Sequence, residues 1–568
     1  MGNHAEEITA MHKFSNAQEK VITSPASSIL VLAGPGSGKT STMIGRIRRL
    51  IASGVKAAEM VIITFTNAAA GEIVRRISEP DKEIRFGYIG TLHGFCLKLL
   101  QEYGSVIGYG KRVTVLDDEQ AIEMLLLTAK ALKCRASEND LLETKRQGPH
   151  VGGNMTQREL AVQTYFAKLR ETATLDFDMI LFEARRLLDK NTRLPWSHLF
   201  VDEYQDSGNL DATIYRALPC KHKFFVGDPD QAIYGFRGGN IQNILTATVE
   251  CELHLLEENY RSALNICTMA NKLIRFNRYR HEKLIRCMNN APGYGTAWVC
   301  KTDDGEAAHI ATHIGNWIAE GSETPDEIAV LCRSNSIAAK VAQAIEAAKI
   351  PVRKKPVNNN PEDWSFAKLT LDLLVNPNNE TIAGFWINHK FEKAEAEKLK
   401  RAAKIKQCPL ISLPEIPPIP STTLASMPED MARLGVSRQS IEKIQAKQAE
   451  LISPTLLELA FAISRDTEQK HEEGHGVTVT TIHAAKGREW STVIICGCEQ
   501  EVIPGNRGDL EEERRIMFVA VTRAKQRLVV SYSQARRQPW GRQSYEDHEP
   551  SQFLLELSGD QTREQLSK

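Results

Sequence analysis

The sequence predicts an α/β protein built from two parallel-sheet lobes, each interrupted by a mainly helical insertion. Short apolar runs end repeatedly in polar clusters and alternate with helical patterns, which is typical of parallel sheets. These runs form two groups that lie far apart in the chain, and a helix-rich stretch interrupts each group. A length of 568 residues is enough for about three to four domains.

The predicted boundaries follow these two groups. We expect the first lobe at residues 1–95 and 186–254, with a helical insertion at 96–185. We expect the second lobe at residues 255–355 and 477–568, with a shortened helical insertion at 356–476. Beyond the first strand, the predicted strands lie at residues 60–64, 198–201, 223–226, 327–331, 477–482, 492–497 and 527–532. A proline cluster at residues 414–420 predicts an extended connection between small helices.

Composition sets limits on the partners and the compartment. The 71 basic residues balance the 71 acidic ones, so any nucleic-acid surface must be a local patch. No apolar run approaches membrane-spanning length, and the first 13 residues lack the apolar core of a secretory signal. The 11 cysteines include no CxxC pair, which favours reduced thiols. We therefore expect a cytoplasmic protein with no membrane partner.

The strongest motif is an apolar run at residues 29–33 followed by a glycine-rich loop that ends in Gly38-Lys39-Thr40. In such a loop, backbone N–H groups surround the phosphates of a nucleotide, Lys39 adds a cation, and Thr40 offers its hydroxyl to Mg²⁺. The usual leading glycine is Ala33 here, a small residue that still permits close backbone approach. The sequence therefore predicts binding of ATP or GTP. The predicted nucleotide-binding loop comprises Ala33, Gly34, Pro35, Gly36, Ser37, Gly38, Lys39, Thr40 and Ser41.

An acidic pair follows a later apolar run. Asp202 is suited to Mg²⁺ coordination, and Glu203 is suited to polarising the attacking water. Alone, such a pair is more often a solvated turn, but together with the upstream loop it indicates hydrolysis. A further loop carries Gln231, which we expect to sense the terminal phosphate. The same loop carries Tyr234 and Phe236, whose rings we expect to face a flat group.

Taken in order, these motifs resemble the superfamily 1 helicases of the UvrD, Rep and PcrA type, from Gln18 to Arg523. The resemblance implies two RecA-like lobes, with ATP and Mg²⁺ as cofactors. It implies that Gln18 reads adenine, that Tyr260 stacks on it, and that Arg261 and Arg523 reach the phosphates when the lobes close. The alternative to a catalytic role for either arginine is a surface ion pair. The catalytic set is Lys39, Glu203, Gln231, Arg261 and Arg523, and the second lobe also contributes Gly487 and Glu489 to the nucleotide site.

The resemblance also implies a track for single-stranded DNA across both lobes. An aromatic side chain that stacks on a base contributes about 1–3 kcal/mol and tolerates any sequence. The family usually has tryptophan where this chain has Phe236, a smaller platform that should still stack. For Trp540, packing in a core is an equally good interpretation. The expected DNA-binding residues are Phe65, Thr91, His93, Tyr234, Phe236, Arg237, Arg333, His483 and Trp540.

Three features depart from the expected pattern or resemble a different kind of site. Ser41 stands where the family carries an arginine that stacks on adenine, so we expect weaker discrimination between ATP and GTP. The segment His471-Glu472-Glu473-Gly474-His475 matches the HExxH pattern of zinc proteases, but glycines flank it, and we expect a solvated loop. Cys496 and Cys498 lie in an apolar strand, where we expect packing in the core.

The predicted function is an ATP-dependent DNA helicase that moves 3′ to 5′ along single-stranded DNA and unwinds duplex at single-strand/duplex junctions. The polarity is implied by the resemblance alone. A second hypothesis is a DNA-stimulated ATPase subunit that unwinds little alone and serves a nuclease, a repair factor or an anti-phage defence complex such as the Gabija type. A third is a signalling NTPase without nucleic acid, against which Tyr234, Phe236 and His483 argue.

Overall fold

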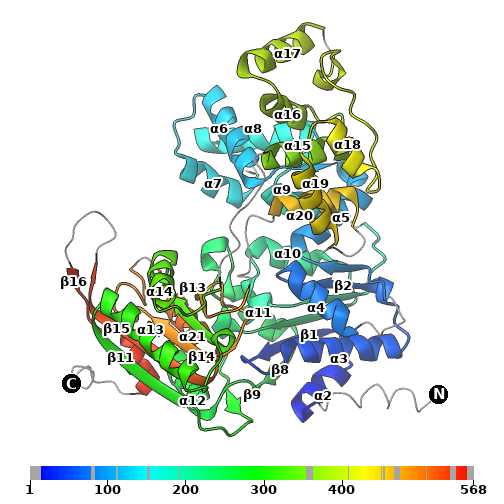
Figure 1. The fold of residues 1–568 in the computed structure, drawn as a ribbon. Helices are drawn as coiled ribbons and strands as arrows, with labels where there is room; N and C mark the ends of the chain where they lie inside the picture. The colour runs from blue at the N-terminus through cyan, green and yellow to red at the C-terminus, as the bar shows by residue number, and fades with distance from the viewer. Residues whose placement is uncertain are drawn as a thin grey trace.

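A computed structural model provides the fold of the chain (Figure 1). The structure describes residues 14–77, 84–109, 113–149, 154–190, 192–353, 363–406, 408–449, 451, 454–465, 474–506, 508–537 and 545–559.

The first lobe is a parallel sheet with strand order β3-β2-β6-β7-β1-β8. The inner strands β1, β2, β6 and β7 are mostly buried apolar runs, as expected for a parallel sheet covered by helices, whereas the outer strands β3 and β8 are partly exposed. The strands are β1 (Ser28–Ala33), β2 (Met60–Ile63), β3 (Tyr88–Gly90), β6 (His198–Val201), β7 (His222–Gly227) and β8 (Glu252–Leu256). The accompanying helices are α2 (Asn16–Thr23), α3 (Lys39–Ala52), α4 (Asn67–Ile77), α10 (Asn209–Ala217) and α11 (Ile241–Glu250).

The second lobe is a sheet with strand order β11-β15-β14-β12-β13, in which all of these neighbours are parallel. Its strands are β11 (Tyr294–Thr302), β12 (Ile328–Cys332), β13 (Thr478–Thr481), β14 (Trp490–Cys496) and β15 (Ala524–Arg537), and antiparallel β16 (Tyr545–Asp547) pairs with β15. Its helices are α12 (Leu264–Ile274), α13 (Asp303–Ala319), α14 (Asn335–Ala347), α21 (Leu510–Val521) and α22 (Gln552–Ser558). A short pair, β9 (Glu258–Asn259) and β10 (Arg286–Cys287), lies between the lobes in sequence. The prediction of an α/β fold with two parallel sheets is confirmed.

The first insertion lies between β3 and β6 in the chain. Several of its helices begin at capping boxes, in which a polar N-cap side chain and the residue three positions later satisfy each other's backbone N–H groups. The N-cap residues are Asp117, Ser137 and Thr156. The elements are α5 (Leu92–Tyr103), β4 (Thr114–Val115), α6 (Asp118–Ala131), α7 (Glu138–Gln147), α8 (Gln157–Glu171), β5 (Thr174–Leu175) and α9 (Phe177–Leu188).

The second insertion lies between α14 and β13 in the chain, but it packs over the first insertion and not over its own lobe (Figure 1). It comprises α15 (Trp364–Val375), α16 (Glu380–Lys390), α17 (Lys393–Lys406), α18 (Met427–Arg433), α19 (Arg438–Ala449) and α20 (Leu456–Arg465). The predicted proline-rich connection at residues 414–420 lies outside these helices, between α17 and α18, and follows a short 3₁₀ turn at Leu410–Ser412.

Buried polar contacts join the two insertions. The side-chain amide of Asn379, only 1% exposed, donates to the hydroxyls of Thr114 and Thr174, each at 2.9 Å. Lys368 forms an ion pair with Asp117 at 2.6 Å. One continuous cluster of buried apolar side chains runs from the first-lobe sheet through both insertions. The two insertions therefore share one core with part of the first lobe, whose sheet also contributes to a second, separate cluster.

None of the described helices is long and apolar enough to cross a membrane.

Candidate active site

A cleft of about 2380 Å³ contains most of the predicted site residues. Residues of both lobes line it, and it is continuous from the glycine-rich loop to the aromatic side chains of the loop after β7. Its walls include Lys39, Thr40, Ser41, Phe65, Asp202, Glu203, Gln231, Tyr234, Phe236, Arg237, Tyr260, Arg261, Arg333, His483, Lys486, Gly487, Glu489 and Arg523.

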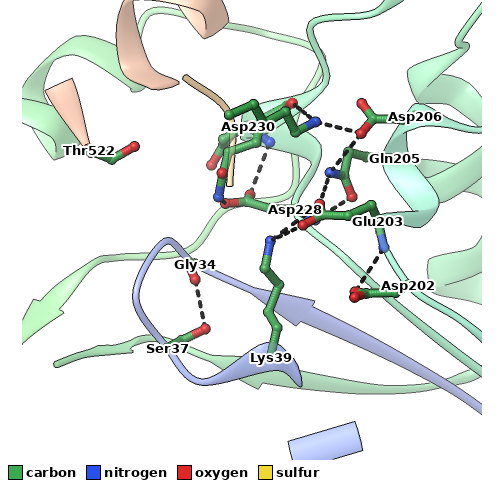
Figure 2. A network of polar contacts seen from close by, with 12 residues as sticks. Gly34, Ser37, Lys39, Asp202, Glu203, Gln205, Asp206, Asp228, Asp230 and Thr522 are labelled. Carbon is green, nitrogen blue, oxygen red and sulfur yellow. Dashed lines mark hydrogen bonds and ion pairs between the residues drawn. The ribbon is translucent and has the colours of Figure 1, made fainter. Parts of the chain in front are cut away.

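The glycine-rich loop connects β1 to α3 at the carboxyl end of the sheet. Gly36 and Gly38 both have positive φ values, +66° and +79°, which favour glycine. A Cβ on Gly36 would also lie 2.6 Å from the Cβ of Arg261, which belongs to the second lobe. The hydroxyl of Ser37 donates to the carbonyl of Gly34 at 2.6 Å and closes the loop (Figure 2). The loop is thus shaped both for phosphates and for close contact with the other lobe.

The acidic pair lies opposite this loop, at the end of β6. The ammonium of Lys39 lies 3.4 Å from both carboxylate oxygens of Glu203 (Figure 2). Burial alone would raise the pKa of Glu203, but the charges of Lys39 and Lys486, together with the hydrogen bonds from Gln205 and Lys39, lower it on balance. Burial, followed by the charge of Glu203, raises the pKa of Asp202. Glu203 is therefore an ionised base, whereas Asp202 is a carboxylate that a cation would stabilise.

The chain of contacts continues from Glu203 into the loop after β7. The amide of Gln205 donates to Glu203 at 2.5 Å, and its oxygen accepts from the backbone N–H of Asp228 at 2.9 Å (Figure 2). The amide of Gln231 donates to the carboxylate of Asp228 at 2.5 Å. Hydrogen bonds therefore connect Glu203 to Gln231 within the first lobe.

Two arginines of the second lobe face this network. Arg261 forms an ion pair with Glu489 and donates to the carbonyl of Thr522 at 3.3 Å. Arg523 is only 2% exposed, and its Nη2 donates to Oε1 of Gln231 at 3.0 Å. Burial, followed by the charge of Arg261, lowers the pKa of Arg523 to about 9. The structure thus brings all five residues of the predicted catalytic set to one cleft.

The predicted adenine site lies beside the start of α3. The amide of Gln18 donates to the carbonyl of Ser37 at 3.0 Å, and the ring of Tyr260 is about half exposed. Arg76 of α4, which sequence reasoning missed, donates to the hydroxyl of Ser41 at 2.7 Å and lines the cleft. An arginine from another helix therefore lies next to the position where the sequence has serine.

Aromatic side chains gather at the other end of the cleft. The rings of Phe65 and Tyr234 are stacked, with centroids 5.0 Å apart and planes 18° apart. Phe236, which is 63% exposed, lies edge-on to His483 with centroids 5.3 Å apart. The guanidinium of Arg237 lies within 6 Å of the Tyr234 and Phe236 rings. These groups form a flat, partly exposed, cationic surface that suits nucleobases.

A second residue missed by sequence reasoning joins the two ends of the cleft. Lys486 follows β13 in the second lobe and forms an ion pair with Asp206 at 2.5 Å. Its ammonium also donates to the carbonyl of Gln231 at 2.8 Å. The sequence predicts His483, Gly487 and Glu489 of this segment as site residues, but it assigns no role to Lys486.

The remaining DNA-track residues lie in different surroundings. Arg333 lines the cleft, where it is paired with Glu513 at 2.6 Å. Burial, followed by the charge of Arg333, lowers the pKa of His483 to about 4. Thr91 caps α5, and His93 packs against Phe177 of the first insertion; neither residue lines the cleft. Trp540 lies outside the described residues.

Family models match almost the whole chain. The UvrD/REP helicase N-terminal domain matches residues 14–252. The UvrD-like helicase C-terminal domain matches residues 254–359 and 376–535. The chain belongs to the UvrD/REP helicase family. The resemblance predicted from the motifs is therefore confirmed.

Individual UvrD/REP relatives are distant but similar over nearly their full length. DNA helicase II of Haemophilus influenzae is 27% identical, and the alignment covers 96% of this chain and 86% of that protein. The ATP-dependent DNA helicase PcrA of Leuconostoc citreum is 26% identical over 97% of this chain and 85% of its own length. DNA helicase II of Escherichia coli K12 is 27% identical over 96% of this chain and 88% of its own length.

The structure bears differently on the HExxH segment and on the cysteine pair of this UvrD/REP chain. His471, Glu472 and Glu473 of the HExxH segment lie outside the described residues, and Nδ1 of His475 lies 2.9 Å from a carboxylate oxygen of Asp326. Cys496 and Cys498 are both buried, in agreement with the predicted packing in the core. Within the described part of the chain, no group of three or more His, Cys, Asp or Glu side chains is placed to hold a metal ion.

Proposed function

We propose that this chain is an ATP-dependent DNA helicase that moves 3′ to 5′ along single-stranded DNA and separates duplex at single-strand/duplex junctions. Membership of the UvrD/REP helicase family supports the class of activity. The observation that carries the mechanism is the continuous cleft between the phosphate loop and the aromatic surface. A single movement of the lobes would act on both ends of this cleft.

At the nucleotide end, the proposed substrate is ATP. Lys39 would neutralise the terminal phosphates, and Glu203 would accept a proton from the attacking water. Its lowered pKa keeps Glu203 ionised at neutral pH, as a general base requires. Gln231 would orient toward the terminal phosphate, since its amide lies between Asp228 and Arg523.

Mg²⁺ is part of this proposal, because the donor set fits it. The hydroxyl of Thr40 and the carboxylate of Asp202 are hard oxygen ligands, and both residues line the cleft. Protein sites for Mg²⁺ often supply only one or two ligands, and phosphates and water supply the others. When bound, the ion would neutralise charge on the phosphates.

The second lobe would complete the site on closure. Arg261 now contacts Glu489, and Arg523 contacts Gln231. We propose that both guanidinium groups shift toward the phosphates when ATP binds, where they would stabilise the charge of the transition state. Gly487 and Glu489 belong to the same segment of the cleft wall, and Gln18 and Tyr260 would hold the adenine.

At the other end, the proposed partner is single-stranded DNA. Phe65, Tyr234 and Phe236 would stack on bases, whereas Arg237, Arg333 and His483 would follow the backbone. Arg333 would exchange Glu513 for a phosphate. Thr91 and His93 also belong to the proposed DNA track, although neither residue lines the cleft.

Unwinding of tailed duplexes tests this proposal. A labelled duplex with a 3′ single-stranded tail should be separated when ATP is added, whereas the same duplex with a 5′ tail should not. Separation of the 5′-tailed substrate alone would contradict the polarity. ATP turnover stimulated by DNA without separation of either substrate would support the alternative, a subunit that depends on a nuclease, repair or defence partner.

A further inference from the structure

Two cations of the second lobe, Lys283 and Arg280, lie beneath the loop that follows β7 in the first lobe. Lys283, 4% exposed, forms ion pairs with Asp228 at 2.7 Å and with Asp230. Arg280 binds both carboxylate oxygens of Asp230, at 3.1 and 2.9 Å. Both aspartates are at most 2% exposed. The two carboxylates and two cations form a neutral cluster in which only Arg280 is partly exposed.

The members of this cluster come from different lobes. Asp228 and Asp230 belong to the loop after β7, in the first lobe, whereas Arg280 and Lys283 lie between α12 and β10. Two buried carboxylates so close together would repel each other without the cations. The conformation of the first-lobe loop therefore depends on a segment that the second lobe supplies.

The cluster has a direct connection to Gln231. One carboxylate oxygen of Asp228 accepts from Lys283, and the other accepts from the amide of Gln231 at 2.5 Å. The oxygen of that amide then accepts from Arg523 at 3.0 Å. Lys283 and the backbone N–H of Asp230, at 3.1 Å, therefore hold the same oxygen of Asp228. Asp228 in turn sets which way the amide of Gln231 faces.

We propose that Lys283 is a positioning residue for hydrolysis, which acts through Asp228 to hold Gln231 in the orientation that Arg523 and the terminal phosphate require. This inference rests on the proposed function of Gln231. It adds a contact by which the position of the second lobe controls a first-lobe residue of the nucleotide site. Neither Lys283 nor Arg280 belongs to the motifs that identified the site in the sequence.

A double-mutant cycle on the full chain tests this role. Steady-state ATP turnover is measured for the native protein, Lys283→Met, Gln231→Ala and the double variant, with saturating single-stranded DNA and varied ATP. We expect Lys283→Met to lower kcat at least tenfold and to change the KM for ATP less than twofold. Because Lys283 acts through Gln231, the double variant should turn over within twofold of Gln231→Ala alone.

A matched control separates positioning from stability. Lys145 is also a buried lysine paired with two aspartates, Asp176 at 2.9 Å and Asp178 at 2.8 Å, but it lies in the first insertion. Lys145→Met should lower the melting temperature and leave the kcat of the folded protein within twofold of native. A kcat for Lys283→Met within twofold of native, or losses that multiply in the double variant, would overturn the proposal.

A charge-balanced variant covers the case in which Lys283→Met does not fold. Lys283→Met combined with Asp228→Asn removes one charge of each sign and keeps the contact between Arg280 and Asp230. It should fold and show the same loss of kcat, whereas native turnover would overturn the proposal. If the native protein hydrolyses ATP without stimulation by DNA, the proposed function fails, but the coupling of Lys283 to Gln231 is still measured in the unstimulated reaction.

Discussion

The ammonium of Lys486 lies 5.0 Å from the centre of the Tyr234 ring. The same ammonium forms an ion pair with Asp206, which follows the acidic pair Asp202 and Glu203 in the chain, and it donates to the carbonyl of Gln231. One cation of the second lobe therefore contacts both the nucleotide network and the aromatic surface of the first lobe. This contact therefore connects the two ends of the cleft directly.

Replacement of Lys486 should weaken communication between the two ends. We expect Lys486→Met to reduce the ratio of DNA-stimulated to unstimulated ATP turnover at least tenfold, because Tyr234 and Asp206 lose their common cation. The ratio is measured with and without an oligonucleotide. Lys400→Met, at a partly exposed position of α17 in the second insertion, should leave the ratio unchanged. An unaltered ratio in Lys486→Met would argue against this connection.

Loss of a stacking ring should weaken DNA binding and spare much of the unstimulated hydrolysis. Phe236→Ala should reduce affinity for single-stranded DNA about 5- to 150-fold, which corresponds to about 1–3 kcal/mol for one stacked base. Fluorescence anisotropy of a labelled oligonucleotide measures the change. Tyr279, also 63% exposed, lies outside the cleft wall, so Tyr279→Ala serves as the matched control. Equal losses in the two variants would refute the stacking role.

Arg76 should compensate in part for the serine at position 41. Since its guanidinium lies 2.7 Å from the Ser41 hydroxyl, we expect it to contact the base opposite Tyr260. A cation–π contact contributes about 0.5–2 kcal/mol, so Arg76→Ala should raise the KM for ATP about 2- to 30-fold. Steady-state kinetics with ATP and GTP measure this effect. Arg49→Ala, an exposed change on α3, is the control, and an equal rise in KM there would contradict the assignment.

Acid should destabilise the first lobe through a pair of stacked histidines. They lie at the amino ends of β6 and β7, whereas the nucleotide site lies at the carboxyl end of the sheet. The rings of His198 and His222 are 4.6 Å apart. Burial, followed by the charge of His222, lowers the pKa of His198 to about 4, well below the value near 6.5 expected in the unfolded chain. The unfolded chain therefore binds a proton at this histidine more strongly than the folded protein does. The free energy of unfolding should keep its full value above about pH 7 and fall by about 1–3 kcal/mol as the pH drops from about 6.5 toward 4.

Urea unfolding at pH 7.5 and pH 5 measures this effect. His198→Asn should show a smaller fall in the free energy of unfolding than native, whereas His389→Asn, at an exposed position of α16, should match native. A fall in His198→Asn as large as that of the native protein would show that other groups cause the acid sensitivity.

Asn379 should hold the two helical insertions together. Its buried amide donates to Thr114 and Thr174, so Asn379→Ala leaves buried hydroxyls without their donor and should lower the free energy of unfolding by about 1–3 kcal/mol. Hydrogen exchange should accelerate in both insertions together. Asn388→Ala provides an exposed control, because the side chain of Asn388 accepts a hydrogen bond from Lys400 at the surface. Faster exchange confined to the second insertion would contradict a shared core.

The sequence predicts those parts of the molecule that depend on local pattern. The loop before Lys39 and the acidic pair at Asp202 follow buried strands of one parallel sheet, so their convergence follows from topology. Contacts between distant segments were not predictable in this way. Lys283 lies more than 50 residues after Asp228, and nothing in its neighbourhood distinguishes it from a surface lysine.

The packing of the second insertion was also beyond the reach of sequence patterns. An apolar face on α15 or α20 indicates burial, but it does not identify the surface that covers it. Here that surface belongs to the first insertion and the first lobe, although the chain enters from the second lobe. Arg76 was missed for a related reason, because its contact with Ser41 depends on how α4 packs beside α3.

The most direct test of the central claim is ATP turnover by the purified native protein with and without single-stranded DNA. If one cleft joins the nucleotide to the aromatic surface, an oligonucleotide should raise turnover at least tenfold, and Lys39→Ala and Glu203→Ala should abolish it. Turnover that is the same in the presence and absence of the oligonucleotide, together with no retention of that oligonucleotide, would contradict the account.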